Sequence, residues 1–200
     1  MDDIKSKPIT EPGLLRERRS GLPSFIIDIL ETLILAVILF VAINAISARI
    51  RVDGSSMEPT LHGGEYVLVN KLSYRLGQPE YGDVIVFYYP RDPQQEYIKR
   101  VIGLPGDKVD ISDGSVFVNG VLLEEPYIAA APIYPGSWLV PDHSLFVLGD
   151  NRNNSSDSHS WGAVPVSYVV GKAILVYWPP PAWGMIEHQG YAAVEQELNR

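Results

Sequence analysis

The sequence contains no cysteine, which excludes disulfide bonds, thiol catalysis and zinc sites with cysteine ligands. The few histidines have no H-x-x-x-H or H-E-x-x-H spacing, so neither a metal site nor a cofactor is expected. The chain also lacks an excess of positive charge. Its net charge of −8 argues against nucleic acid as a partner, because phosphate binding requires a basic surface.

One long apolar run occupies residues 25–48, and its part from Thr32 to Ala48 carries no charge. About 20 apolar residues suffice to cross a bilayer as a helix. A cleaved signal peptide is disfavoured because its apolar region is usually shorter, about 7–15 residues. A buried core helix is disfavoured because no amphipathic face is visible. We therefore expect 25–48 to be a retained transmembrane helix in contact with the lipid bilayer.

The segment before this run, 1–24, is polar and is interrupted by proline and glycine. It carries a group of lysines and arginines, which predicts a cytoplasmic N-terminus by the positive-inside rule. Arg49 and Arg51 follow the run and weaken this asymmetry slightly. We expect 1–24 to be a cytoplasmic tail and 49–200 to lie on the extracytoplasmic side of the plasma membrane.

Residues 49–200 predict a mainly β, antiparallel domain. Short runs rich in β-branched and aromatic residues alternate with Gly, Pro and Asp, and no long amphipathic helix separates them. The dipeptide Asn119-Gly120 predicts a two-residue hairpin turn within 116–123. Residues 127–144 are expected to form a loop. The last segment, 182–200, is expected to be peripheral and able to form a short helix.

Ser56 is a candidate nucleophile. Gly54 precedes it and Pro59 follows it, so it lies on a bend that can expose its hydroxyl and direct backbone N–H groups toward one point. Serine beside glycine and proline is more often simply part of a turn. As a nucleophile, Ser56 would need a base, because a serine hydroxyl is too weakly acidic at neutral pH.

Two bases are available in the sequence. Lys99 lies in a predicted strand, on the same face as Tyr97 and Val101, where burial would favour its neutral amine. The alternative for such a lysine is to extend its charged end into water. His159, with Asp157, could instead complete a Ser–His–Asp set, although the surrounding Asn- and Ser-rich loop is also typical of a purely structural turn.

Four segments, taken together, resemble bacterial type I signal peptidase, the membrane-bound serine protease that removes signal peptides from exported proteins. They follow the apolar run in the family's order and cover about 50–178. They are Gly54–Leu61 with Ser-Met-x-Pro-Thr-Leu, Gly82–Pro90, Tyr97–Asp107 with Lys-Arg-Val-Ile-Gly-Leu-Pro-Gly-Asp, and Gly149–Ser158 followed by Trp161-Gly162.

The resemblance implies a signal-peptidase-type β domain, with Ser56 as nucleophile and Lys99 as general base. It implies that Ser155 orients the lysine amine and that Asp157 braces the site with the residue two positions on. It also implies structural roles in the same loop for Asp150 and Arg152. A substrate-pocket or oxyanion role is implied for Met57, Gly54, Ser55, Val84, Ile85 and Val86. The last three of these lie in a strand that is expected to pair with the substrate.

The substrates implied are preprotein signal peptides with a small-x-small site such as Ala-x-Ala. The chain departs from the family pattern at Gly54, where some members carry a serine that completes the oxyanion hole, and at Asn153, where aspartate is common. His159 stands where arginine is usual, and a single anchor differs from members with two. Two other function classes compete. A self-cleaving Ser–Lys repressor-type protein would lack a membrane span and need a cleavable partner domain, and neither expectation fits this sequence. A non-enzymatic, membrane-tethered β domain that binds exported proteins is the other alternative.

Overall fold

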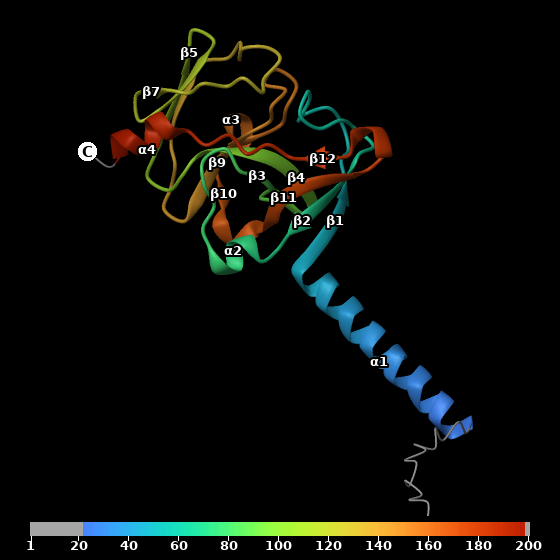
Figure 1. Cartoon of the computed structure of the whole chain (residues 1–200). Coiled ribbons are helices and arrows are strands. Elements are labelled where there is room, and N and C mark those ends of the chain that lie inside the picture. The colour runs from blue at the N-terminus through green and yellow to red at the C-terminus, as the bar shows by residue number, and fades with distance from the viewer. Residues whose placement is uncertain (1–21, 199–200) are drawn as a thin grey trace, which may run out of the picture. The chain divides into compact units, whose positions relative to one another are not determined.

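The computed structural model describes residues 22–198 (Figure 1). Two compact units make up the chain, one up to Ala42 and one from Ile43 onward. The first unit contains most of helix α1, Leu22–Ile46. Within helix α1, the segment Phe25–Ile46 has a mean hydropathy of 2.7 and no buried residue, so this segment is long and apolar enough to cross a membrane. The predicted tail at 1–24 lies, except for 22–24, outside the described residues.

The predicted end of this helix at residue 48 is wrong by two residues. Ser47 and Ala48 begin strand β1, Ser47–Arg51, and pair with Asn70 and Val69 of strand β2. Apolar composition does not distinguish the end of a helix from the start of a half-buried strand, so only the pairing with β2 decides this boundary.

The second unit is built from strands, four very short helical segments between them, and a final helix. The strands after β1 are β2 (Tyr66–Asn70), β3 (Val84–Tyr89), β4 (Asp92–Gly103), β5 (Lys108–Ser112), β6 (Ser115–Val118), β7 (Val121–Leu122), β8 (Gly136–Leu139), β9 (Ser144–Leu148), β10 (Val164–Pro165), β11 (Val169–Trp178) and β12 (Gly184–Met185). The helices are α2 (Ser73–Leu76), α3 (Ser158–Trp161), η1 (Val166–Tyr168), η2 (Pro180–Ala182) and α4 (Ala192–Leu198).

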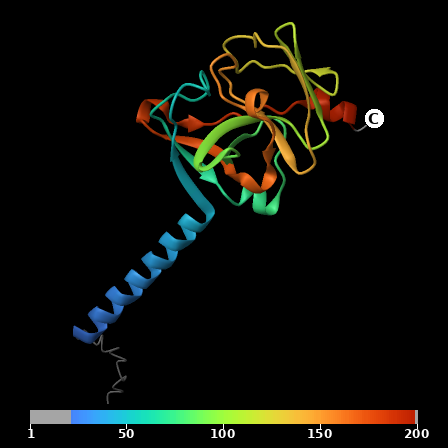
Figure 2. The ribbon, with the colours of Figure 1, turned by 180° about the vertical axis from the view of Figure 1, so that it is seen from behind.

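These strands form two sheets, and every pairing is antiparallel. The larger sheet has the order β1-β2-β11-β3-β4-β9-β10, with β12 added to β11, and the smaller has the order β7-β6-β5-β8. Figures 1 and 2 show β5 and β7 of the smaller sheet beyond one end of the larger one. The predicted class, mainly antiparallel β with one N-terminal apolar helix, is confirmed.

Two local predictions have different outcomes. Asn119 and Gly120 both take positive φ, 52° and 82°, between β6 and β7, so the predicted hairpin turn is confirmed. The predicted loop at 127–144 contains strand β8, which pairs with β5 at the edge of the smaller sheet. Its four residues lie close to prolines on both sides, and so short an edge strand leaves little alternation in the sequence.

The C-terminal segment is not peripheral. Ile186, Tyr191 and Val194 are all buried and belong to the hydrophobic core. Figures 1 and 2 show this segment, in red, crossing the domain from β12 to α4 beside β7. The short helix expected in this segment is present as α4, but its peripheral position was predicted wrongly, because scattered apolar residues without a clear period do not indicate burial.

Candidate active site

Ser56 lies in a turn that follows β1 and is anchored by buried neighbours. Met57 and Leu61 point into the core and are 1% and 0% exposed. The N–H of Leu61 donates to the Met57 carbonyl, and the N–H of Glu58 donates to the Ser55 carbonyl. Because the core holds the residues after Ser56, the turn can present the serine hydroxyl in a fixed direction.

Lys99 brings its amine to this hydroxyl from strand β4. Its Nζ lies 2.7 Å from Ser56 Oγ and donates to the Ile98 carbonyl at 2.9 Å. The lysine is buried, at 4% exposed, and the ring of Tyr97 lies 5.4 Å from Nζ. Of the two alternatives that the sequence left for Lys99, the structure shows burial, and it brings together two residues that are 43 positions apart.

Burial lowers the pKa of Lys99 from 10.5 to about 8, because the charged form loses its solvation. Asp157 and Asp150 oppose this effect, since their negative charges favour the protonated amine. Near neutral pH Lys99 is therefore still mostly protonated, but its neutral form, the state that can accept a proton, is far more populated than in an ordinary lysine.

His159 does not occupy the position of a base for Ser56. Its Nδ1 lies 2.6 Å from Asp157 Oδ1, and its ring stacks on Tyr134 with 4.0 Å between the centroids. Within residues 22–198, the only side chain recorded in hydrogen-bond contact with Ser56 Oγ is Lys99. The geometry thus favours lysine over histidine as the partner of this hydroxyl.

Asp157 is fully buried and organises the loop after β9. One carboxylate oxygen accepts from the Gly149 N–H at 2.9 Å, and the other accepts from the His159 N–H at 3.2 Å. This agrees with the implied bracing of Asp157 by the residue two positions on, here a histidine side chain. The arrangement holds both ends of the loop 149–157 together.

Two asparagines that the sequence did not single out connect this loop to the serine turn. The N–H of Asn151 donates to the Ser56 carbonyl at 3.0 Å, and its side chain donates to the Ser55 carbonyl at 3.1 Å. Asn154 Nδ2 donates to Ser55 Oγ at 2.9 Å. The density of Asn in 151–154 was visible in the sequence, but amide side chains have no spacing rule that names a distant backbone partner.

Gly149 and Ser155 lie directly against the serine turn. A methyl carbon at Gly149 would come within 2.3 Å of Ser155 Oγ and 2.4 Å of the Ser56 carbonyl oxygen, so only glycine fits there. In the part of the chain that the structure describes, Ser155 Oγ is buried without a hydrogen-bond partner. The implied contact of Ser155 with the lysine amine therefore stays a prediction.

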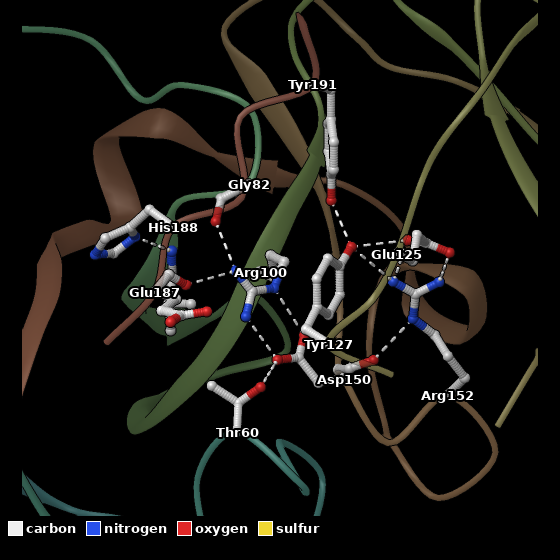
Figure 3. Close-up of polar contacts among 12 residues, drawn as sticks. Thr60, Gly82, Arg100, Glu125, Tyr127, Asp150, Arg152, Glu187, His188 and Tyr191 are labelled. Atoms are coloured by element: carbon white, nitrogen blue, oxygen red, sulfur yellow. Dashed lines mark hydrogen bonds and ion pairs between the residues drawn. The ribbon is translucent and has the colours of Figure 1, made fainter. Parts of the chain in front are cut away.

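Asp150 and Arg152 belong to a buried polar network shown in Figure 3. Arg100 donates to both oxygens of Asp150, at 2.9 and 2.7 Å, and Thr60 Oγ1 donates to the same carboxylate at 2.5 Å. Arg152 donates to both oxygens of Glu125, at 2.7 and 2.5 Å, and to the Gly149 carbonyl at 3.1 Å. Paired in this way, the buried charges fix the first residues of the loop.

A cavity of about 700 Å³ opens beside Ser56 and Lys99. Two strands and the loop contribute its other walls, with Arg49, Ile50, Arg51, Val52, Asp53, Gln95, Glu96, Tyr97, Ile98 and Ser156 in the lining. Strand β1 is at the end of its sheet, and the first half of β4 pairs only with β3. In the described structure both strands thus leave one edge unpaired, and an extended peptide can add to such edges.

The expected role of β3 in pairing with substrate is wrong. From Ile85 to Phe87, strand β3 already has neighbours on both sides, β11 and β4, so this part of the strand has no free edge. Val84, Ile85 and Val86 are fully buried core residues. The sequence could show that this strand is apolar on both faces, but its place in the middle of the sheet depends on long-range pairing.

Other candidate residues lie beside the cavity rather than in its lining. Met57 faces the core, and Gly54 and Ser55 form the turn before the serine. Gly54 has φ of +80°, a conformation that a serine side chain rarely adopts, which gives a physical reason for glycine here. Among the described residues no group of three or more His, Asp or Glu side chains could hold a metal ion.

Residues 26–178 match the family model described as signal peptidase, peptidase S26. This range is more than half of the sequence. The chain belongs to the signal peptidase S26 family. A probable signal peptidase I-2 of Synechocystis sp. is 47% identical over 164 residues, which cover 78% of this chain and 75% of that protein. Signal peptidase I of Leptolyngbya laminosa is 40% identical over 181 residues, covering 86% of this chain and 89% of that protein.

A solved structure from the same family, a signal peptidase I from Enterococcus faecalis, is 34% identical with a TM-score of 0.45, covering 48% of this chain and 96% of that chain. The S26 family match ends at Trp178, before η2, β12 and α4. The four motif segments that resembled the family in sequence lie within the matched range, so the predicted family is confirmed.

Proposed function

We propose that this chain is a signal peptidase I that removes N-terminal signal peptides from exported preproteins with a Ser–Lys pair. The observation that carries this proposal is the 2.7 Å contact between Ser56 Oγ and the amine of the buried Lys99. A serine beside a desolvated lysine is a known means of activating a hydroxyl. Membership in the S26 family supports the same reaction class.

The mechanism starts with neutral Lys99. Its amine takes the Ser56 proton while the serine oxygen attacks the peptide carbonyl, and the Ser56 N–H helps to stabilise the oxyanion. The protonated amine then gives its proton to the peptide nitrogen as the C–N bond breaks. This step leaves the acyl-enzyme and neutral Lys99. Lys99 next takes a proton from water, the hydroxide adds to the acyl carbon, and the serine leaves with that proton.

The cavity suggests how a signal peptide is held. An extended chain that adds to the free edges of β1 and β4 would pass beside Ser56 and Lys99. Next to the serine, the apolar part of the lining comes from Ile50, Val52 and Ile98. Small residues at the first and third positions before the cut, as in Ala-x-Ala, would fit shallow apolar sites of this kind.

For the membrane arrangement we propose a single span. Helix α1 is the anchor, the N-terminus is cytoplasmic, and the unit from Ile43 onward acts on the extracytoplasmic side of the plasma membrane. An anchored substrate in the same bilayer would meet an anchored enzyme at a raised effective concentration. Protease added outside intact cells should digest the domain; digestion only after the cells are opened would reverse the orientation.

The test is cleavage of a preprotein with an Ala-x-Ala site by the detergent-solubilised full chain. Wild type should cut at that site, whereas Ser56→Ala and Lys99→Ala should not. Lys108→Ala, which changes an exposed lysine on the smaller sheet, should retain full activity. Cleavage by Ser56→Ala would place the nucleophile elsewhere. Binding of the preprotein without cleavage by wild type would favour the non-enzymatic alternative.

A further inference from the structure

Tyr127 lies at the centre of the polar network in Figure 3. Its hydroxyl contacts Glu125 Oε1 at 2.8 Å, Arg152 Nη2 at 3.3 Å and the hydroxyl of Tyr191 at 2.5 Å. Its ring also covers the guanidinium of Arg100 at 4.0 Å. One side chain therefore touches both arginines of the network, by its ring on one side and by its oxygen on the other.

The proton count at this oxygen fixes the direction of each hydrogen bond. A phenol has one proton, and Tyr127 donates it to the Glu125 carboxylate. The oxygen must then accept from Arg152 and from Tyr191, so the Tyr191 hydroxyl is the donor in the contact between the two tyrosines. This oxygen has used its donor and both of its lone pairs, so its position is strongly determined.

From the two arginines the network reaches the catalytic serine in one further step. Arg100 holds the Asp150 carboxylate, and Arg152 holds the Gly149 carbonyl. Gly149 packs against the Ser56 carbonyl, and Asp150 directly precedes Asn151, whose N–H donates to the same carbonyl. A shift of Gly149 or Asp150 would thus be transmitted directly to the backbone of the nucleophile.

At its other end the network depends on the C-terminal segment, which lies beyond the S26 match. The Glu187 carbonyl accepts from Arg100 at 3.0 Å, and Tyr191 is 4% exposed. A methyl carbon at Gly82 would lie 1.7 Å from the Gln189 carbonyl oxygen, so the segment is tightly seated on the strand region before β3. The segment is thereby held rigidly enough to fix Tyr191.

We propose that Tyr127 and Tyr191 are positioning residues for the reaction: they hold Arg100 and Arg152, and through these the Gly149–Asp150 backbone, against the turn that carries Ser56. The catalytic part of this inference rests on the proposed function. Neither tyrosine contacts the cavity that would hold the substrate. Their loss should therefore affect the rate of the bound complex more than the binding of substrate.

Phenylalanine at either position tests this, because it keeps the ring and removes only the hydroxyl. Tyr191→Phe removes the hydrogen bond to Tyr127 and should lower kcat about fivefold, whereas Tyr127→Phe removes three hydrogen bonds and should lower kcat at least as much, with KM unchanged in both. Since the two hydroxyls share one bond, the double variant should lose little more than Tyr127→Phe alone. Tyr81→Phe is the matched control: Tyr81 is as buried as Tyr191 and its ring packs against Tyr191, but its hydroxyl donates to Asp107, and phenylalanine keeps the ring contact.

A purely structural role is separated from positioning by measuring thermal unfolding of all three variants. Positioning is supported if Tyr127→Phe and Tyr191→Phe lower the unfolding midpoint no more than Tyr81→Phe does, and if these two variants lower kcat while Tyr81→Phe does not. Equal kcat in all three variants, or losses in the double variant that simply multiply, would overturn the proposal.

Hydrogen exchange gives a readout that does not need cleavage. In Tyr127→Phe the amides of 149–155 should exchange about fivefold faster than in wild type, and in Tyr81→Phe they should not. Unchanged protection of this loop overturns the positioning role even if the enzyme is active. Faster exchange in Tyr127→Phe, combined with a wild type that cuts no preprotein, would instead support the network and reject the proposed function.

Discussion

At the scale of single residues, two opposing effects determine the pKa of Lys99. Desolvation favours the neutral amine, and the charges of Asp157 and Asp150 favour the protonated one, with desolvation the larger effect. The apolar neighbours on the strand made burial of Lys99 one of two alternatives in the sequence. It could not give the two carboxylates, because both come from a loop about 50 residues away that only the fold brings near.

The pH dependence of cleavage follows from this balance. In the proposed mechanism only neutral Lys99 can take the serine proton, and burial lowers its pKa to about 8. Activity should therefore fall about tenfold per pH unit below that value and level off above it. The measurement is kcat/KM against pH for the solubilised full chain. An acidic limb near pH 10, as for an ordinary lysine, would mean that the amine is not desolvated in the working enzyme.

Lys99 should also cost stability. At pH 7 the folded chain holds a buried cation whose pKa of about 8 lies below the 10.5 of the unfolded state, so protonation favours unfolding. Lys99→Met should raise the free energy of unfolding at pH 7 by about 1–3 kcal/mol while abolishing cleavage. The gain should be largest below pH 8 and vanish as pH approaches 10.5. Lys108→Met, at an exposed lysine, should change neither property.

At the scale of elements, the loop 149–157 after β9 is the part that assembles the site. Asn151 and Asn154 attach it to the serine turn, and Asp157 closes it on itself. The sequence identified this loop by its composition and its resemblance to a family motif. It did not identify the asparagine contacts, because their partners are backbone carbonyls and a hydroxyl on another element.

Gly149→Ala tests how closely the loop and the turn fit. The added carbon would meet the Ser56 carbonyl and Ser155 Oγ well inside contact distance, so one of the two segments must move. If Ser56 is the proposed nucleophile, a displacement of about 1 Å there should lower kcat roughly 100-fold. Gly190→Ala, where no atom lies within 4 Å, is the control and should retain activity. Full activity of Gly149→Ala would show that the turn tolerates movement of the loop.

At the scale of the whole molecule, the C-terminal segment completes the domain. Residues from Gly184 onward add a strand to β11, supply the carbonyl of Glu187 to Arg100 and place three side chains in the core. Nδ1 of the half-buried His188 accepts a hydrogen bond from the Val84 N–H at 3.1 Å. Desolvation lowers the pKa of His188 to about 4, so the ring stays neutral and can accept this bond. The segment is therefore part of the folded unit.

Truncation after Ala182 should lower the free energy of unfolding by at least about 5 kcal/mol, because Ile186, Tyr191 and Val194 leave the core together. Urea unfolding of the full chain and the truncated chain measures this loss. Met185→Ser, at a side chain that is 74% exposed, should leave the midpoint unchanged. A truncated chain of undiminished stability would mean that the segment adds nothing to the core.

The sequence by itself determined the apolar span, the antiparallel β class, the family, and the candidate pair Ser56 and Lys99, because these depend on composition, short-range periodicity and local motifs. The tertiary structure decided which strand edges are free, that β3 is central and closed to a substrate, and that 182–198 belongs to the core. The physical reason is that strand order and burial arise from pairings between residues tens of positions apart. Such pairings depend on the whole set of competing contacts, which no local pattern records.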